Sequence, residues 1–462
     1  ETLTLTGAST ATLGANADTA GLDSATGTIK TGTGATSVTG ANDKHFTIDA
    51  TSLANDTALT LADNDTASNM TVTNLVGNIT ATALDGTLTV TKADNGVDND
   101  VTVTTGVNNT IVNVTTGSGD DTTTIDANAL VNNKTLTLNN VGAGAAGTVN
   151  INNLEADLVF ANVNGASNVV ITLGDNTVDN AITIGSNATT TVNTTLGGGA
   201  STDTVTVGAV SGDVVAAGGG LSSILIVTGS SDAQTITGGA GADTIKGAGG
   251  GDSLTGGDGN DVFQFADTTN LNAAATVIGG NNSDTVHLTT ADTGIADSDF
   301  DKVNTIETLK LTGISTAVLG TNADAAATGT LNIETGAGAT SITGANNKAF
   351  TIDAASLANA TTLTLADDDT ASVFTVTNLV GDTAQTNLAG ALTVTTADNT
   401  DDNTITVVTG AAATDVRTSA GAASDTVTIN ANALADDVNL TLNGDTGAAA
   451  GNVVINNFKG DL

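Results

Sequence analysis

Carboxylate side chains recur at a nine-residue interval in the middle of the chain. Three nonapeptides follow one another without a gap: GGAGADTIK from Gly238, GAGGGDSLT from Gly247 and GGDGNDVFQ from Gly256. Each has Asp at its sixth position and a large apolar residue at its eighth, which predicts a glycine-rich turn of six residues and then a short strand. Turn carbonyls and carboxylates are hard oxygen ligands, and the nonapeptides contain neither Cys nor His. The pattern therefore predicts a site for Ca²⁺.

The three Asp residues are expected on the two edges of a roll. Turns on one side lie two nonapeptides apart, so Asp243 and Asp261 should share one edge and Asp252 should lie on the other. The residues at position eight should fill the interior: Ile245, Leu254 and Phe263. A flexible Gly-rich linker is the alternative, but a linker would not preserve both an Asp and an apolar residue at fixed positions.

This block resembles the repeats of the RTX family of bacterial proteins that leave the cell by type I secretion. The resemblance covers about residues 229–265, where a degenerate repeat, GSSDAQTIT, precedes the other three. It implies that the carboxylates named above bind calcium together with backbone carbonyls of turn residues, namely Gly239, Gly241, Gly257 and Gly259. Ala248 replaces a motif glycine and Gln234 replaces a motif Asp, so we expect fewer ions than repeats.

Looser versions of the motif occur outside the block. GGASTDTVT from Gly198 and GGNNSDTVH from Gly279 keep the paired glycines, the Asp and the apolar residue, which makes Asp203 and Asp284 further candidate calcium ligands. Other Asp-containing turns end in Asp121 and Asp425. The alternative for all of these residues is that Asp caps a turn by accepting hydrogen bonds from its own backbone.

The chain also repeats itself over a much longer interval. ETLTLTGASTATLG from Glu1 returns as ETLKLTGISTAVLG from Glu307, a shift of 306 residues, and after a two-residue deletion ANDKHFTIDATSLAN from Ala41 returns from Ala345. About four in five of residues 41–77 are identical in the second copy, which is typical of repeat architectures. We therefore expect a stretch of a longer tandem array; a two-domain duplication with native termini is the alternative.

Short triplets of apolar, Thr and apolar residues dominate both copies and have the two-residue period of half-buried strands. The absence of Pro suits strands that donate hydrogen bonds on both sides, and Asn in the turns suits side-chain ladders and left-handed backbone. No helical period of useful length appears. We predict an all-β fold, a parallel β-solenoid (β-helix) with a calcium-binding RTX β-roll segment; an immunoglobulin-like sandwich is the alternative, but the chain has no Trp or Tyr.

The predicted organisation has five parts. They are a solenoid in the first partial copy (1–158), its continuation (159–228), the RTX β-roll (229–265), connecting coils (266–306) and a solenoid in the second copy (307–462).

Composition limits the possible functions. The net charge of −39 argues against nucleic acid as a partner, and no apolar run is long enough to insert into a membrane. Enzymes rarely lack Cys, Trp and Tyr altogether, and His45 is replaced by Ala349 in the second copy, so we expect no catalytic activity. The clusters around Asp63 and Asp367 are expected to be solvated loops or loose cation sites rather than an acid/base pair.

Outside the nonapeptides, the composition rich in Thr, Gly, Asn and Ala is similar to that of surface-layer proteins and giant adhesins. This resemblance implies a secreted, non-enzymatic protein of the bacterial cell surface that associates with itself into a calcium-stabilised layer or filament. An extension region of an RTX adhesin is the alternative, and an accessory module of a polysaccharide-modifying enzyme is a third. Cell-surface polysaccharide is a further possible partner.

Overall fold

A computed structural model gives the fold of most of the chain. It describes residues 2–13, 27–40, 45–63, 68–93, 100–114, 121–140, 148–162, 168–173, 179–184, 191–195, 202–207, 214–217, 224–229, 233–345, 348–367, 372–386, 388–397, 404–418, 426–444 and 452–458. The chain divides into two compact units, Glu1–Ser253 and Leu254–Leu462. This division falls inside the segment expected to form the β-roll, and the five predicted parts stay predictions.

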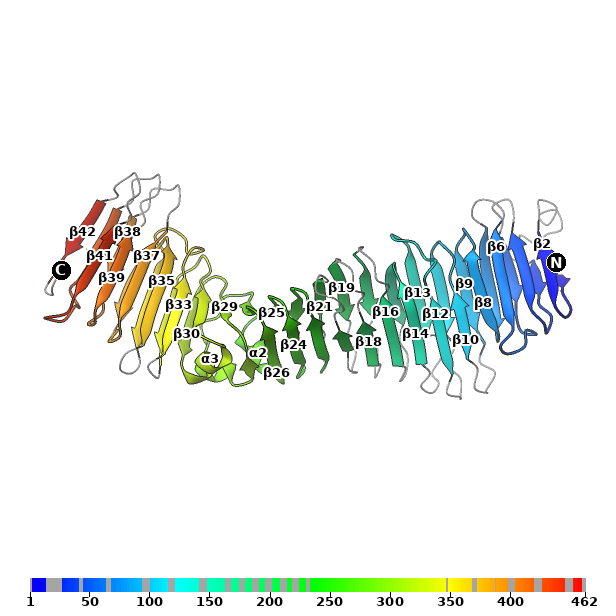
Figure 1. Cartoon of the computed structure of the whole chain (residues 1–462), viewed down its shortest axis with the longest axis horizontal. Helices are drawn as coiled ribbons and strands as arrows, with labels where there is room; N and C mark the ends of the chain where they lie inside the picture. The colour runs from blue at the N-terminus through cyan, green and yellow to red at the C-terminus, as the bar shows by residue number, and fades with distance from the viewer. Residues whose placement is uncertain are drawn as a thin grey trace. The chain divides into compact units, whose positions relative to one another are not determined.

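In the first unit, parallel strands alternate along the chain (Figure 1). The odd-numbered strands belong to one sheet, and the even-numbered strands belong to a second sheet except β22, which belongs to a third. The odd-numbered strands are β1 (Thr2–Thr4), β3 (Thr28–Lys30), β5 (His45–Asp49), β7 (Asn69–Leu75), β9 (Leu88–Lys92), β11 (Thr110–Val114), β13 (Thr135–Asn140), β15 (Asp157–Asn162), β17 (Ala181–Ile184), β19 (Thr202–Val207), β21 (Ile224–Thr228) and β23 (Thr244–Lys246). The even-numbered strands are β2 (Ser9–Thr12), β4 (Thr36–Gly40), β6 (Ala58–Asp63), β8 (Asn78–Ala83), β10 (Val101–Thr104), β12 (Thr122–Asp126), β14 (Thr148–Leu154), β16 (Asn168–Leu173), β18 (Thr191–Thr195), β20 (Val214–Ala217) and β22 (Thr235–Gly239).

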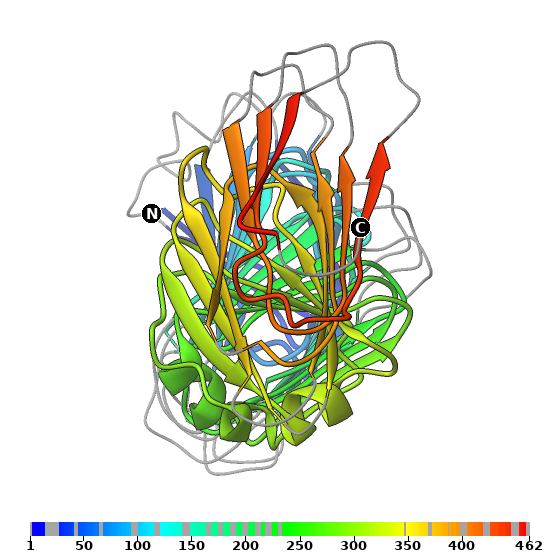
Figure 2. The same cartoon turned by 90° about the vertical axis from the view of Figure 1, so that its left-hand side faces the viewer.

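The second unit has the same alternation, with its odd-numbered strands in one sheet and its even-numbered strands in three shorter sheets. Its orange and red strands fall into two layers in the end-on view of Figure 2. The odd-numbered strands are β25 (Val262–Phe265), β27 (Thr285–Leu288), β29 (Thr308–Lys310), β31 (Leu331–Glu334), β33 (Ala349–Asp353), β35 (Val373–Leu379), β37 (Leu392–Thr396), β39 (Thr414–Thr418) and β41 (Leu440–Gly444). The even-numbered strands are β24 (Ser253–Asp258), β26 (Thr276–Asn281), β28 (Val303–Asn304), β30 (Ser315–Leu319), β32 (Thr340–Gly344), β34 (Thr362–Asp367), β36 (Asp382–Thr386), β38 (Thr404–Val408), β40 (Thr426–Asn430) and β42 (Asn452–Asn456).

Each coil of the solenoid contains one odd-numbered and one even-numbered strand. Met70 of β7 pairs with Leu88 of β9, 18 residues later, and Thr110 of β11 pairs with Leu136 of β13, 26 residues later. The pairing is parallel, which confirms the predicted β-solenoid and excludes the sandwich alternative. Successive apolar triplets of the sequence are successive strands, and a coil takes two of them.

The core consists of apolar side chains that stack from coil to coil. Ile48 pairs with Val72, Val72 with Val90 and Val90 with Val112, and all four side chains are fully buried. Burying one such side chain contributes about 1.5–3 kcal/mol, and β-branched residues pack well at equivalent positions of neighbouring strands. The triplets that the sequence analysis identified supply these columns in both copies.

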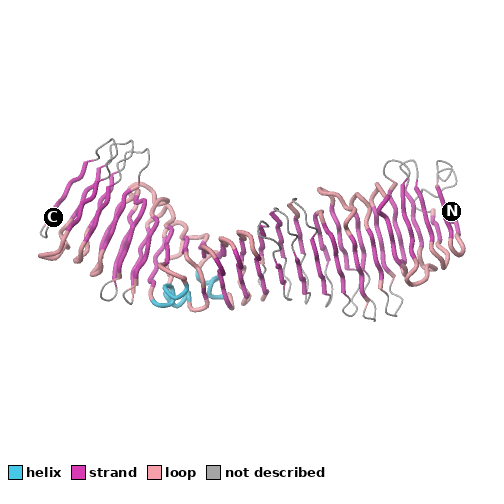
Figure 3. The backbone as a smooth tube through the Cα atoms, viewed as in Figure 1, coloured by secondary structure: helices cyan, strands magenta, loops and turns pink. Residues whose placement is uncertain are grey.

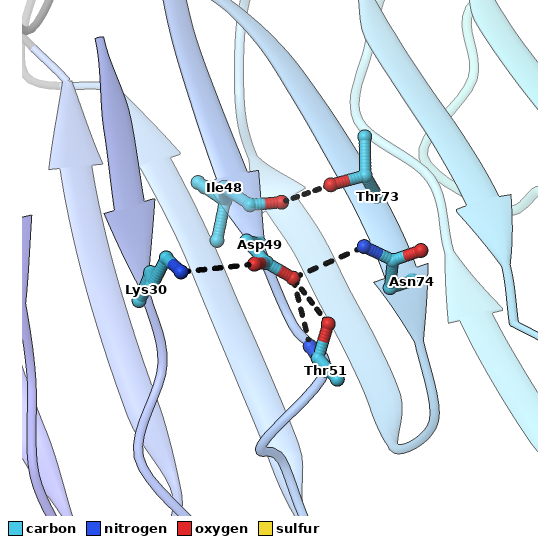
Figure 4. Close-up of polar contacts among 6 residues, drawn as sticks. All are labelled: Lys30, Ile48, Asp49, Thr51, Thr73 and Asn74. Carbon is cyan, nitrogen blue, oxygen red and sulfur yellow. Dashed lines mark hydrogen bonds and ion pairs between the residues drawn. The ribbon is translucent and has the colours of Figure 1, made fainter. Parts of the chain in front are cut away.

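Asn residues join successive coils in two ways. In the first, side chains form a ladder, because the Asn139 Nδ2 donates to the Asn113 Oδ1 at 3.0 Å. In the second, Asn74 adopts left-handed backbone with φ 55° and its Nδ2 donates to the Oδ1 of Asp49 at 3.1 Å, so that Asp49 lies between Asn74 and Lys30 (Figure 4). Both uses of Asn predicted from the sequence are therefore confirmed.

The left-handed Asn is a repeated feature of the coils. In the second copy Asn378 has φ 53° and donates to Asp353 at 3.1 Å, and Asn153 makes the same bond to Asp126 in another coil of the first unit. The strand pairing shifts register beside Asn74, Asn153 and Asn378. The Asn therefore lies at a β-bulge that bends the strand out of the sheet.

Two short helices among the described residues were not predicted. α2 (Thr268–Ala273) and α3 (Thr321–Ala326) lie at one edge of the second unit with a 3₁₀ turn, η1 (Asp297–Phe300), in contact with both (Figure 3). Each helix has only six residues, fewer than two turns, so the sequence shows no helical period. The Asp267 side chain accepts a hydrogen bond from the Asn270 amide and caps α2. Of the described helices, none is long and apolar enough to cross a membrane.

The left-handed Asn gives a test of the fold. We expect Asn378→Ala to destabilise the chain more than Asn378→Gly, because both variants lose the bond to Asp353 but only Ala places a Cβ at φ 53°. The difference between the two variants should be about 1 kcal/mol, since left-handed backbone costs about 1–2 kcal/mol for a residue other than Gly. Urea unfolding measures this difference, and equal stability of the two variants would contradict the bulge assignment.

Candidate calcium site

The nonapeptide turns depend on glycine conformations. Gly239, Gly257 and Gly259 have φ of 130°, 116° and 123°, values that favour glycine. Gly241 lies in the bend between β22 and β23. β22 ends at Gly239 and β24 ends at Asp258, so the first residues of the repeats from Gly238 and Gly256 extend the preceding strand, and these two turns are shorter than the predicted six residues. The repeat from Gly247 begins just after β23, which ends at Lys246, and keeps the predicted six-residue turn.

The apolar residues at position eight lie where the sequence placed them. Ile245 on β23, Leu254 on β24 and Phe263 on β25 are fully buried. Each follows its motif Asp by two residues, so the alternation of the strand buries the apolar side chain in the core just beyond the turn.

Each motif Asp links its own coil to the preceding one. The Oδ1 of Asp243 accepts a hydrogen bond from the backbone amide of Leu225 at 2.7 Å, and the Oδ1 of Asp252 accepts one from the amide of Gln234 at 3.0 Å. In both cases the donor lies 18 residues earlier, which is one coil. The carboxylates therefore lie inside the stack rather than on its surface.

The same contact occurs in the second unit with a longer coil. The amide of Asp261 donates to the Oδ1 of Asp284 at 2.8 Å, across 23 residues. Both side chains are fully buried, as are Asp243 and Asp252. The loosely matching Asp284 therefore lies in the same kind of environment as the Asp residues of the three regular repeats.

Burial makes the negative charge of these carboxylates costly. It raises the pKa of Asp243 and Asp252 to about 6, and it raises the pKa of Asp284 to about 7 with a further contribution from the charges of Asp261 and Glu307. The Oδ2 atoms of Asp252 and Asp284 are buried and have no hydrogen-bond partner among the described residues. A buried carboxylate of this kind requires a counter-charge.

Carbonyl oxygens converge on the carboxylates. A Cβ placed on Gly256 would lie 2.1 Å from the Oδ2 of Asp261 and 2.6 Å from the carbonyl oxygen of Gly279, so a larger residue has no room there. The two oxygens face one small space from neighbouring coils. Hard oxygens from a carboxylate and a carbonyl are the ligands that Ca²⁺ takes, and the residues present fit this ion.

The degenerate repeat keeps the position of the oxygen but not its charge. The Oε1 of Gln234 would lie 3.0 Å from a Cβ on Gly229, and Gly229 precedes Gln234 by five residues just as Gly256 precedes Asp261. A neutral amide in place of a carboxylate weakens cation binding. The expectation of fewer ions than repeats stays a prediction.

Side chains alone do not form a metal centre. Among the described residues, no group of three or more His, Cys, Asp or Glu side chains is arranged to hold a metal ion. Backbone carbonyls must therefore supply most of the ligands, as the glycine-rich turns lead us to expect. The assignment of carbonyl ligands to Gly239, Gly241, Gly257 and Gly259 stays a prediction.

The other candidate Asp residues differ from one another. The Oδ1 of Asp203 accepts hydrogen bonds from the amide and the Nδ2 of Asn180 at 3.1 and 3.0 Å. Asp121 forms an ion pair of 2.8 Å with Lys92, in which both side chains are buried. Lys92 is a cation already in place, which disfavours calcium at Asp121. Asp425 and the glycines that precede Asp203 lie outside the described residues.

The comparison with protein-family models identifies this segment. Residues 228–263 match the RTX calcium-binding nonapeptide repeat, in four copies. The chain therefore contains RTX repeats, and the cofactor that they take is Ca²⁺. Comparison with curated proteins and with solved structures finds no match.

The raised pKa values predict how pH affects the metal-free chain. A carboxyl group whose pKa is 3.8 when unfolded and about 6 or 7 when folded stabilises the fold at low pH, and this contribution is lost as pH rises through 6–7. In chelator, the melting temperature should therefore fall between pH 4 and pH 8. Excess calcium should remove the fall; thermal unfolding that is independent of pH in chelator would contradict the burial of these charges.

A matched pair of variants tests the ligand assignment. Asp252→Asn keeps the oxygen that accepts from Gln234 but removes the charge, so it should lower the number or affinity of bound calcium ions measured by calorimetric titration. Asp258→Asn, at position three of a neighbouring repeat, should leave both unchanged, because the Asp258 Oδ1 only accepts a bond from Asn281 on the surface. Equal losses in the two variants would count against a role for position six.

Proposed function

We propose that this protein is a non-enzymatic, extracellular structural protein whose solenoid is stabilised by calcium and which associates with itself into a surface layer or filament. The observation that carries the proposal is the position of the buried carboxylates. Asp243 and Asp252 each bond to the preceding coil, so an ion bound there would hold coils together. This arrangement suits a structural role, and the solenoid is a structural kind of fold.

The long internal repeat supports self-association. In the first copy Thr47 pairs with Thr71, and in the second copy Thr351 pairs with Thr375 in the same register. Equivalent side chains therefore recur on equivalent coils, and a contact made by one copy is available again on the next. Regular lattices and filaments are built from contacts that repeat in this way.

Charge and calcium together support an extracellular location. RTX-repeat proteins are typically secreted, and a chain with a net charge of −39 repels itself unless divalent cations reduce the repulsion. At low calcium the buried carboxylates would oppose folding, and at high calcium the binding free energy would add to the stability of the fold. Type I secretion of an unfolded chain that folds outside the cell is consistent with this coupling.

An adhesin extension region is the second candidate function. A calcium-stiffened solenoid would also serve to hold a ligand-binding domain, which would recognise a partner such as cell-surface polysaccharide, away from the cell. The two functions differ in whether copies associate. An accessory module of a polysaccharide-modifying enzyme is the third candidate, and no cluster of side chains among the described residues specifically favours it.

Electron microscopy distinguishes the first two functions. We expect the purified chain to form fibres or sheets in millimolar calcium and to disperse in excess chelator. Isolated rods at every calcium concentration would favour the adhesin extension. Morphology and melting temperature that are both unaffected by calcium would contradict the calcium-stabilised structure itself.

A further inference from the structure

The coil that follows the matched repeats carries a second copy of the site geometry. The family match ends at residue 263, whereas β26 continues to Asn281 and β27 begins at Thr285. The turn between these two strands presents Asp284. This coil is longer than a pair of nonapeptides because α2 lies within it.

The oxygens around Gly279 repeat those around Gly256. A Cβ on Gly279 would lie 2.4 Å from the Oδ2 of Asp284 and 1.9 Å from the carbonyl oxygen of Thr305. In both places a glycine leaves space for the Oδ2 of the Asp five residues later and for a carbonyl oxygen from the next coil.

The separation of the two oxygens suits one shared ion. Calcium binds oxygen at about 2.3–2.6 Å, so two ligands of one ion are at most about 5 Å apart. The Oδ2 of Asp284 and the carbonyl oxygen of Thr305 meet this limit, because each lies within 2.4 Å of the position that a Cβ on Gly279 would occupy. The Asp284 side chain is fully buried, and its Oδ2 has no hydrogen-bond partner among the described residues.

The neighbouring backbone is held in an unusual conformation. Thr305 has φ 53°, which a β-branched residue rarely adopts, and its Oγ1 accepts a hydrogen bond from the amide of Gly280 at 2.8 Å. This bond joins the turn of Thr305 to the turn of Gly280, next to the Oδ2 of Asp284 and the carbonyl oxygen of Thr305.

Glu307 is the last in a series of acidic residues that each accept a hydrogen bond from the backbone amide of the acid in the preceding coil. The Oε2 of Glu307 accepts from the amide of Asp284 at 2.8 Å, as the Oδ1 of Asp284 accepts from Asp261. The other oxygen of Glu307 accepts from the hydroxyl of Thr328. Both oxygens of Glu307 are therefore engaged, whereas Asp284 keeps one oxygen open.

We propose that Asp284 and the carbonyl oxygen of Thr305 hold a further Ca²⁺ ion, outside the segment that matches the family and at the coil where the series of carboxylates ends. This inference rests on the proposed calcium-stabilised structure and adds an ion to it. It extends calcium binding to the coil that contains α2.

Counting bound ions tests the proposal. Equilibrium dialysis against calcium should give at least one ion fewer for Asp284→Asn than for the wild-type chain, because Asn keeps the bond to Asp261 but loses the charge. The control is Asp301→Asn, an exposed acid close by, which should bind the wild-type number. Unfolding in chelator should show that Asp284→Asn is folded.

The outcomes separate this inference from the proposed function. If the wild type binds calcium and Asp284→Asn binds the same number with the same affinity, the further site is wrong and the proposed function stands. If the wild type binds no calcium, both fail. If Asp284→Asn does not fold, a density map of the wild type in calcium decides, since a missing peak between Asp284 and Thr305 would overturn the site.

Discussion

The structure depends on carboxylates that are buried between stacked coils. In an ordinary β-solenoid, apolar columns and backbone ladders hold neighbouring coils together. Here the buried side chains of Ile48, Val72 and their equivalents form such a column, and their strands pair through the backbone. At Asp243, Asp252 and Asp284 the stack instead encloses acids whose pKa burial raises to about 6 or 7. Such acids oppose folding when they are ionised, and they favour it when a cation occupies the space beside them. In the proposed function, calcium concentration would thus control the stability of the stack.

The chain neutralises buried charge in more than one way. Asp121 forms an ion pair with Lys92. The second copy cannot form this ion pair, because Thr396 stands in place of Lys92. Asp49 lies nearer the surface and is satisfied by Thr51 and Asn74 (Figure 4). The glycine-rich turns at Gly256 and Gly279 combine a buried acid with a carbonyl oxygen that faces it.

The buried acids of the nonapeptides and many of the strands could be predicted from the sequence. The nonapeptide spacing identified the buried Asp residues and the apolar residues that follow them, and the triplets identified most strands of the second copy. The strands from β29 to β32, and the strands β36 (DTAQT) and β39 (TDVRT), were not identified; β36 and β39, for example, contain no apolar triplet. The helices were missed because six residues show no period. Two properties are invisible in the sequence: the partner of each carboxylate, which depends on coil lengths of 18 or 23 residues, and the open oxygen of Asp284 beside Thr305.

Hydrogen exchange measured by mass spectrometry, with and without calcium, tests the central claim most directly. The amides of Leu225 and Gln234 donate to Asp243 and Asp252, whereas β5 and β7 form a ladder without motif Asp residues. We predict that calcium slows exchange at least tenfold across residues 225–263 and leaves residues 45–75 unchanged. Exchange across residues 225–263 that is the same with and without calcium would contradict the account.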